Sequence, residues 1–325
     1  MLKTSRILVT GAKGFLGKHV FDELRNRGYS NIIECANNDT PSRTMHIDGD
    51  MSFCCDLRKK EDVHSLISFT KPDVVIHLAA RVGGIGANQA NPATFIYDNL
   101  TMGINLIESC KKHVDKFVLA GTVCSYPKHC PVPFEEDNIW NGYPEETNAP
   151  YGIAKKTLSV MLSAYRRQYG LNGITVIPVN MYGPHDDFNP ASSHVIPALI
   201  KKIEEAGPDG DLEIWGTGNA SREFLHVRDS ARGIVRAAES YEEDSPVNLG
   251  THHEIKIFEL VNTLREIMGH KGKVFYETSM PDGQPRRCLD TSKAKTKFGF
   301  EAKISLKDGL KETVEWYLSS VAEKV

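Results

Sequence analysis

The chain has 325 residues, of which 40% are hydrophobic and 25% are charged, proportions typical of a globular enzyme or binding protein. Its net charge of −3 provides no general attraction to nucleic acid or to an anionic membrane, so we expect neither as a partner. No apolar run approaches the ~20 residues that span a bilayer.

The cysteine content indicates a reducing environment. The seven cysteines are odd in number and include no Cys-x-x-Cys pair, so we expect free thiols and a cytoplasmic protein. The first residues contain no apolar signal core, which favours the same localisation. The twelve histidines show no spacing typical of a metal site, and we expect no bound metal.

Strands alternate with helices as far as about residue 180. Continuous apolar runs such as VVIHLAA are typical of strands buried on both faces of a parallel sheet. The alternation therefore predicts an α/β fold with a doubly wound parallel sheet of the Rossmann type. Strands are expected over 6–10, 31–36, 74–80, 116–122 and 173–180, and helices from the first loop to about Arg27 and over 59–69, 94–113 and 151–169.

The pattern loosens after Tyr182-Gly183-Pro184. A helix over about 194–206 and a strand over 212–215 are expected there, and the stretches VRDSARGIVRAAES and PVNLG predict a helix and a strand that return to the sheet. We therefore expect a smaller, discontinuous α/β lobe over the carboxyl edge of the strands. The expected division is a cofactor-binding domain over 1–181 and 229–252, and a substrate-binding domain over 182–228 and 253–325.

The stretch VTGAKGFLG places Gly11, Gly14 and Gly17 between the first strand and the first helix. Such glycines permit a tight turn and a close approach of a pyrophosphate to the backbone, and the free N–H groups of a helix N-terminus favour anions. Glycine-rich turns also occur in loops that bind nothing. The position of this loop at the start of a βαβ unit predicts a dinucleotide site.

The residues after the second strand favour NADP(H) over NAD. An NAD site usually has an acidic residue at the end of this strand, but the strand here ends in Cys35-Ala36-Asn37-Asn38, with Glu34 inside it and Asp39 past it. Lys13 in the glycine loop is a candidate partner of a 2′-phosphate. Asp56 and Leu57 are candidates for the adenine site, although Asp56 is equally suited to cap the helix over 59–69.

The stretch PYGIAKKT places Tyr151 and Lys155 four residues apart on one face of a helix. An adjacent ammonium and an oxidised nicotinamide both favour a phenolate, which would let the tyrosine exchange a proton with a carbonyl or alcohol oxygen. Thr122, at the end of the 116–122 strand, offers a hydroxyl to the same oxygen. Tyr-x-x-x-Lys is common on surface helices, and a strand-end threonine is often only structural.

Together, the glycine loop, the strand-end hydroxyl and Tyr-x-x-x-Lys resemble the extended short-chain dehydrogenase/reductase superfamily. The resemblance covers the whole chain and implies hydride transfer at C4 of a nucleotide-linked sugar held by the smaller lobe. It implies the following cofactor contacts: Gly11, Lys13, Gly14, Phe15, Leu16, Gly17, Asp56, Leu57, Leu78, Ala79, Ala80, Tyr151, Lys155, Asn180 and His194.

Five further stretches resemble the family of GDP-L-fucose synthases within that superfamily. They are RVGGIGAN, TVCSYPK, YGPHDDFNPASSHVIPAL, WGTGNASREFLHV and PDGQPRR. The resemblance implies NADPH-dependent 3,5-epimerisation and 4-reduction of a GDP-linked 4-keto-6-deoxy sugar, GDP-4-dehydro-6-deoxy-D-mannose. By position, Cys124 and His194 match the epimerisation pair of this family, and Thr122, Tyr151 and Lys155 match its reduction triad.

Other interpretations of these residues remain open. A cysteine beside a strand is more often a packing residue, and a histidine such as His194 often starts a helix. Cys130 is expected to be structural. Thr122 stands where the family usually has serine, followed by Val123, which leaves open another GDP-4-keto sugar such as a heptose. A GDP-mannose 3,5-epimerase-like enzyme and a non-catalytic sensor of NADP(H) are further alternatives.

The resemblance also implies substrate contacts and an assembly. Arg222 and Arg286 are expected to bind a diphosphate, since a guanidinium forms paired hydrogen bonds to phosphate. Trp215 is equally suited to be a core residue, and Lys202 to be a solvated one. The helices over 94–113 and 151–169 suggest a homodimer through a four-helix contact, as in this superfamily. The full set of expected substrate contacts is Asn180, Lys202, Trp215, Arg222, Asp282 and Arg286.

Overall fold

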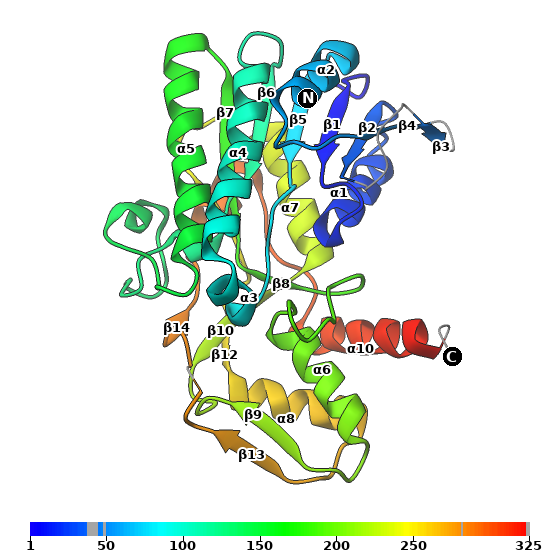
Figure 1. Ribbon diagram of the computed structural model, residues 1–325, viewed down its shortest axis with the longest axis vertical. Helices are drawn as coiled ribbons and strands as arrows, with labels where there is room; N and C mark the ends of the chain where they lie inside the picture. The colour runs from blue at the N-terminus through cyan, green and yellow to red at the C-terminus, as the bar shows by residue number, and fades with distance from the viewer. Residues whose placement is uncertain (38–44, 48–49, 281, 323–325) are drawn as a thin grey trace.

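The computed structural model describes residues 1–37, 45–47, 50–280 and 282–322. Its largest element is an eight-stranded sheet with the order β11-β7-β6-β5-β1-β2-β4-β3, in which all strands but the edge strand β3 are parallel (Figure 1). This confirms the predicted doubly wound parallel sheet. The strands are β1 (Ile7–Thr10), β2 (Ile32–Ala36), β3 (Met45–Ile47), β4 (Asp50–Cys54), β5 (Val74–His77), β6 (Lys116–Ala120), β7 (Asn172–Pro178) and β11 (Val247–Leu249).

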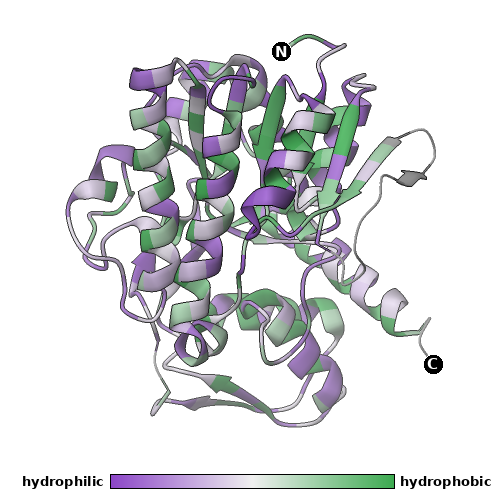
Figure 2. Ribbon diagram, turned by 45° about the horizontal axis from the view of Figure 1, so that its top comes forward, coloured by the Kyte–Doolittle hydropathy of each residue, from purple (hydrophilic) through white to green (hydrophobic). Residues whose placement is uncertain are grey.

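Helices cover both faces of this sheet because successive strand residues point to opposite sides. Ile7 and Val9 belong to one hydrophobic core, and Leu8 between them belongs to the other. The strands accordingly form the hydrophobic centre in Figure 2. The first core is shared with α1 (Phe15–Asn26) and α7 (Val227–Ser240), and the second with α2 (Lys60–Thr70), α4 (Pro92–Cys110) and α5 (Ala149–Tyr169).

The expected strand over 173–180 is in fact two strands. β7 ends at Pro178, and the chain continues at once as β8 (Asn180–Tyr182), which pairs with β10 (Ser221–His226) in a different sheet. Asn180 therefore lies at the junction between the large sheet and the smaller part of the molecule.

The smaller part, at the bottom of Figure 1, has its own core. None of the helices in the described part of the chain combines the length and the apolarity that crossing a bilayer requires. The elements of this part are β8, β10, β12 (Glu254–Lys256) and β14 (Arg286–Arg287) in one sheet, the parallel pair β9 (Leu212–Trp215) and β13 (Val274–Glu277), and the helices α6 (Val195–Ala206), α8 (Ile257–Met268) and α10 (Leu306–Ala322).

Part of the C-terminal segment packs with the large sheet. Leu289, Phe300 and the helix α9 (Ser292–Phe298) share the core of β11 and α7. The expected division had assigned all of 253–325 to the smaller domain, because hydrophobic periodicity locates a helix but does not indicate which core it joins. The limits of the two domains stay a prediction.

Candidate active site

A single large cavity of about 1100 Å³ runs along the carboxyl ends of the parallel strands and into the smaller part of the molecule. Gly11, Cys55, Gly121 and Val179 line it directly after β1, β4, β6 and β7. The sheet order reverses between β1 and β5, and ligands of doubly wound proteins bind at this switch point. The fold therefore creates a site where two parts of the molecule meet.

The glycine loop shapes one end of the cavity. Gly11 has a φ of +72°, and a Cβ at this position would lie 2.8 Å from the backbone nitrogen of Ala79. α1 begins directly afterwards, with Gly14 as its N-cap and no side chain bonded to its free N–H groups. Phe15, Leu16 and Gly17 also line the cavity. The loop thus fits a pyrophosphate, which needs backbone donors and no intervening side chain.

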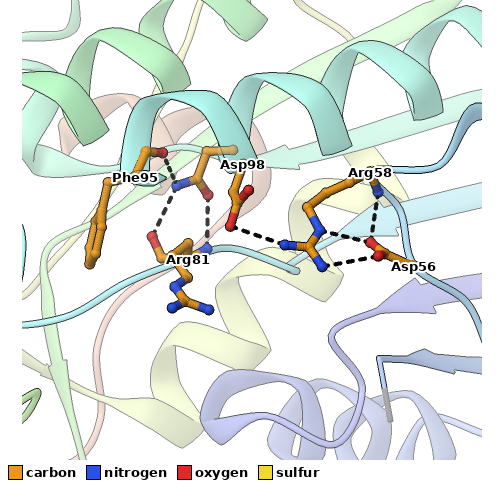
Figure 3. Close-up of polar contacts among 6 residues, drawn as sticks. Asp56, Arg58, Arg81, Phe95 and Asp98 are labelled. Carbon is orange, nitrogen blue, oxygen red and sulfur yellow. Dashed lines mark hydrogen bonds and ion pairs between the residues drawn. The ribbon is translucent and has the colours of Figure 1, made fainter. Parts of the chain in front are cut away.

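The carboxylate of Asp56 is held by its neighbour Arg58 (Figure 3). The backbone nitrogen, Nε and Nη2 of Arg58 donate to Asp56 over 3.0, 2.9 and 3.0 Å, and Nη1 lies 3.5 Å from Asp98. Hydrogen bonding from Arg58 lowers the pKa of Asp56. α2 starts at Lys60 without a side-chain cap, so Asp56 does not cap this helix. Both Asp56 and Arg58 line the cavity, and sequence reasoning missed Arg58.

The residues expected to select the dinucleotide lie in different places. Asn37 lines the cavity, whereas Lys13 is exposed and is not among the lining residues. Glu34 is half-buried inside β2, and Asp39 lies outside the described residues. The suggested contact between Lys13 and a 2′-phosphate therefore has no support from the geometry. The remaining expected cofactor contacts, Leu57, Leu78, Ala79 and Ala80, all line the cavity.

Thr122 and Cys124 are positioned by a short 3₁₀ helix that follows β6. The Thr122 hydroxyl oxygen accepts a hydrogen bond of 3.2 Å from the Cys124 backbone nitrogen at the start of this helix, η1 (Val123–Ser125). Ser125 Oγ donates to the Gly152 carbonyl oxygen over 2.9 Å, which fixes η1 against the first turn of α5. This contact brings Cys124 close to Tyr151.

Gly152 makes that approach possible. A Cβ at this position would lie 2.2 Å from the Cys124 carbonyl oxygen, so the backbone itself would have to move. We expect Gly152→Ala to lower the free energy of unfolding by about 1–3 kcal/mol, as overpacking does, and to displace Cys124 from Tyr151. Urea denaturation checks this prediction, with Gly86→Ala as control because nothing lies within 4 Å of a Cβ there. Equal stability of both variants would contradict it.

Burial dominates the electrostatics of the tyrosine and the lysine. It raises the pKa of Tyr151, the electrostatic interaction with Cys124 acts in the same direction, and an interaction with the Thr122 hydroxyl opposes them. Burial lowers the pKa of Lys155 to about 8. The sequence had suggested that the lysine favours the phenolate, but in the structure burial is the larger effect on Tyr151. Tyr151 therefore stays a neutral hydroxyl that is able to donate its proton.

His194 precedes α6 as its N-cap residue and lines the same cavity as Cys124. The residue keeps a solvent-exposed surface, although the surrounding protein groups partly desolvate its imidazole. This burial lowers the pKa of His194, and Arg287 acts in the same direction, whereas Asp187 raises it. The structure therefore places a thiol and an imidazole in one cavity, as the sequence predicted, with the imidazole favoured in its neutral form.

Arg222 and Asp282 form part of the wall contributed by the smaller sheet. Arg222 donates through Nη1 to the Ser221 carbonyl oxygen over 2.8 Å and through Nη2 to the Asp282 carbonyl oxygen over 3.0 Å. Burial lowers the pKa of Arg222 to about 9, and Arg287 contributes. The Asp282 carboxylate accepts from the nitrogen and the hydroxyl of Thr217, both over 2.8 Å. Asp282 thereby secures the loop that follows β9.

Lys202 and Trp215 extend the cavity beyond this loop. Lys202 Nζ donates to the Glu213 carbonyl oxygen over 3.1 Å and lies 5.2 Å from the centre of the Trp215 ring. Trp215 is 57% exposed, so it is not the core residue that the alternative interpretation required. Both residues line the cavity.

The structure places Arg287, and not the expected Arg286, at the cavity. Arg286 is exposed and forms an ion pair with Glu254. Arg287 is buried and lines the cavity, where its Nη1 donates to Asn180 Oδ1 over 3.0 Å. Neighbouring residues of a strand point to opposite faces, so only one of the two arginines of β14 is able to reach the site. A sequence alone does not indicate which one.

The fold and this cavity define an enzyme of the epimerase and dehydrogenase class that uses a nicotinamide cofactor. The sequence model described as "NAD dependent epimerase/dehydratase family" matches residues 7–250, and the chain belongs to that family. Among curated proteins, GDP-L-fucose synthase 1 of Arabidopsis thaliana is 38% identical over 325 residues, which cover 99% of this chain and 96% of that protein.

Solved structures agree with this membership. A GDP-6-OMe-4-keto-L-xylo-heptose reductase from C. jejuni has a TM-score of 0.88 and 28% identity, covering 98% of this chain and 99% of the other. A GDP-L-fucose synthetase from Naegleria fowleri bound to NADP has a TM-score of 0.83 and 26% identity, covering 99% of this chain and 96% of the other.

Proposed function

We propose that this enzyme converts GDP-4-dehydro-6-deoxy-D-mannose to GDP-L-fucose with NADPH. One observation carries the proposal: a single cavity holds both a thiol–imidazole pair, Cys124 and His194, and a reduction group, Thr122, Tyr151 and Lys155. The similarity to GDP-L-fucose synthases along nearly the whole chain supports the same substrate.

The cysteine and the histidine suit epimerisation. Hydrogens on the carbons that flank a 4-ketone are acidic, because the enolate delocalises its charge onto the ketone oxygen. The Cys124 thiolate removes such a proton, and His194, after taking up a proton from solvent, returns one to the other face of the ring. Proton exchange with solvent then restores both groups, so that C5 is inverted after C3 in the same way. Thr122 and Tyr151 donate to the enolate oxygen and stabilise its charge.

The same donors suit reduction. A bound nicotinamide nucleotide supplies the hydride that C4 receives. Tyr151 gives its proton to the C4 oxygen, and Lys155, one helical turn away, stabilises the resulting phenolate. The buried, neutral state of the Tyr151 hydroxyl agrees with a proton donor.

The GDP moiety fits the wall formed by the smaller sheet. The described hydrogen bonds of the Arg222 guanidinium go to carbonyl oxygens and not to a carboxylate. Its positive charge therefore suits the binding of a diphosphate. Lys202 lies near the exposed ring of Trp215, on which a base is able to stack, and Asp282 fixes the loop that follows this residue. Asn180 lies where the large sheet meets this wall and so reaches both sugar and cofactor.

NADP(H) is favoured over NAD by the end of β2, where Asn37 offers no negative charge to repel a 2′-phosphate. We expect Asn37→Asp to shift the ratio of kcat/KM for NADPH to that for NADH toward NADH by at least about tenfold, or about 1.4 kcal/mol. Steady-state kinetics with both cofactors measure this ratio, with Asn37→Ser as the uncharged control. An unchanged ratio in Asn37→Asp would place the 2′-phosphate site elsewhere.

The decisive experiment for the function is incubation of the keto sugar with NADPH in deuterated water. The proposal requires loss of absorbance at about 340 nm and deuterium at C3 and C5 of the product. Deuterium without loss of absorbance would indicate an epimerase, and loss of absorbance without deuterium a simple reductase. A second candidate, action on a GDP-4-keto heptose, is favoured by the similarity to the heptose reductase and by Thr122 in place of serine.

We also propose a homodimer through α4 and α5. These helices pack against each other and expose large apolar side chains to solvent, among them Tyr97 (66% exposed) and Val160 (50% exposed). Such a face suits a second copy of the same helix pair in a four-helix contact. Sedimentation of the full chain would reveal a monomer if this proposal is wrong.

A further inference from the structure

Arg287 is a buried cation without a carboxylate partner among the described residues. It is 7% exposed, and no described carboxylate lies within ion-pair distance of its guanidinium. Its Nε donates to Gln284 Oε1 over 3.1 Å, and its Nη1 donates to Asn180 Oδ1 over 3.0 Å. The same Nη1 lies 3.9 Å from Cys124 Sγ. A buried guanidinium that only neutral oxygens solvate favours an anion beside it.

The two amide partners are themselves fixed, so the guanidinium is held in place. Gln284 Nε2 donates to the carbonyl oxygens of Pro127 and Lys128 over 3.1 and 3.0 Å. Asn180 Nδ2 donates to the Glu223 carbonyl oxygen over 2.9 Å. Each amide nitrogen is thus occupied by a backbone oxygen, and each amide oxygen faces Arg287.

Cys124 is an ionisable residue whose side chain lies beside the Arg287 guanidinium. Cys124 is half-buried and lines the cavity, and its sulfur lies at contact distance from Nη1. A thiolate, and not a thiol, is the reactive form of cysteine, and a neighbouring arginine stabilises it. Arg222, the other buried arginine of this wall, is bonded to two backbone oxygens of its own sheet and is repelled by Arg287.

We propose that Arg287 is a positioning residue that stabilises the thiolate of Cys124 and directs it into the cavity. Its role differs from that of Arg222, which binds the diphosphate. The inference rests on the proposed function only for the identity of the substrate, because the contact between guanidinium and sulfur exists in the protein without substrate.

The experiment compares neutral and charged replacements of Arg287 in the full-length protein. Arg287→Met and Arg287→Gln remove the charge, Arg287→Lys retains it, and Arg286→Gln is the matched control on the same strand. Iodoacetamide labelling of Cys124 at neutral pH is followed by mass spectrometry of its peptide. We expect labelling to slow at least about tenfold in the two neutral variants and to stay within about threefold in Arg287→Lys and Arg286→Gln.

Two results would overturn the inference. One is labelling that is unchanged in the folded neutral variants, and the other is an equal loss in Arg287→Lys, which would mean that shape and not charge matters. Affinity for GDP, measured by calorimetry, is expected to stay within about threefold in the neutral variants. A large loss of GDP affinity with normal labelling would make Arg287 a diphosphate ligand instead. Because labelling needs no turnover, it distinguishes failure of this inference from failure of the proposed reaction.

Discussion

Replacing Cys124 with serine is expected to slow deuterium exchange at C3 and C5 of the keto sugar by about 10²–10⁴-fold, the usual contribution of a general acid–base group. The serine hydroxyl occupies nearly the same space, but it does not ionise near neutral pH as a thiol does. Binding of the cofactor should be unchanged, because Cys124 is not among the expected cofactor contacts and lies outside the glycine loop. Exchange is followed by NMR in deuterated water.

Cys130→Ser is the matched control for this variant. Cys130 lies six residues further on, does not line the cavity, and has a pKa that burial raises to about 11. Its replacement should leave exchange within about twofold of the original rate, since it removes no reacting group. Full exchange in Cys124→Ser would assign the proton transfer to another residue.

The second large effect is expected for Tyr151→Phe, which should reduce NADPH oxidation by about 10²–10⁴-fold. The phenyl ring preserves the packing of α5, so the variant loses only the hydroxyl that gives its proton to the C4 oxygen. Exchange at C3 and C5 should fall less, because the Thr122 hydroxyl still donates to the enolate oxygen. Parallel measurements of absorbance and deuterium content separate the two steps.

Tyr169→Phe, at the far end of the same helix, controls for the loss of a phenol from α5. Normal NADPH oxidation in Tyr151→Phe would mean that another group gives its proton to the C4 oxygen. An equal loss of exchange and reduction would mean that Tyr151, and not Thr122, bears most of the enolate charge.

These variants test a site in which the same donors bind one ketone oxygen during both inversions and during the reduction. The hydroxyls of Thr122 and Tyr151 lie close enough to interact, and the Thr122 hydroxyl also holds the backbone of Cys124. Two inversions and one reduction are then able to share one position of the sugar ring. A shared position of the ketone oxygen requires that the thiol, the phenol and the cofactor loop line the same cavity.

Much of this site follows from local sequence. The glycine loop, Thr122 and Tyr-x-x-x-Lys each lie within or directly beside a single strand or helix, and hydrophobic periodicity is sufficient to place such elements. Parallel strands bring their carboxyl ends to one edge, so Gly11, Thr122 and the start of α5 were expected to meet there. The edges of β9 and α7 agree with the sequence-based expectation residue for residue.

The substrate wall, in contrast, depends on contacts between distant segments. Arg287 reaches the cavity because β14 pairs with β10 in a register that matches Ser221 with Arg286 and Arg222 with Arg287. A shift of one residue would exchange the two arginines, and local sequence does not encode that choice. The sequence by itself determined the sheet and the glycine loop and indicated the candidate reacting groups, because each is specified within one short segment. Only the tertiary structure decided which arginine lies beside Cys124 and that Arg58 also reaches Asp98, because contacts between distant segments fix these positions.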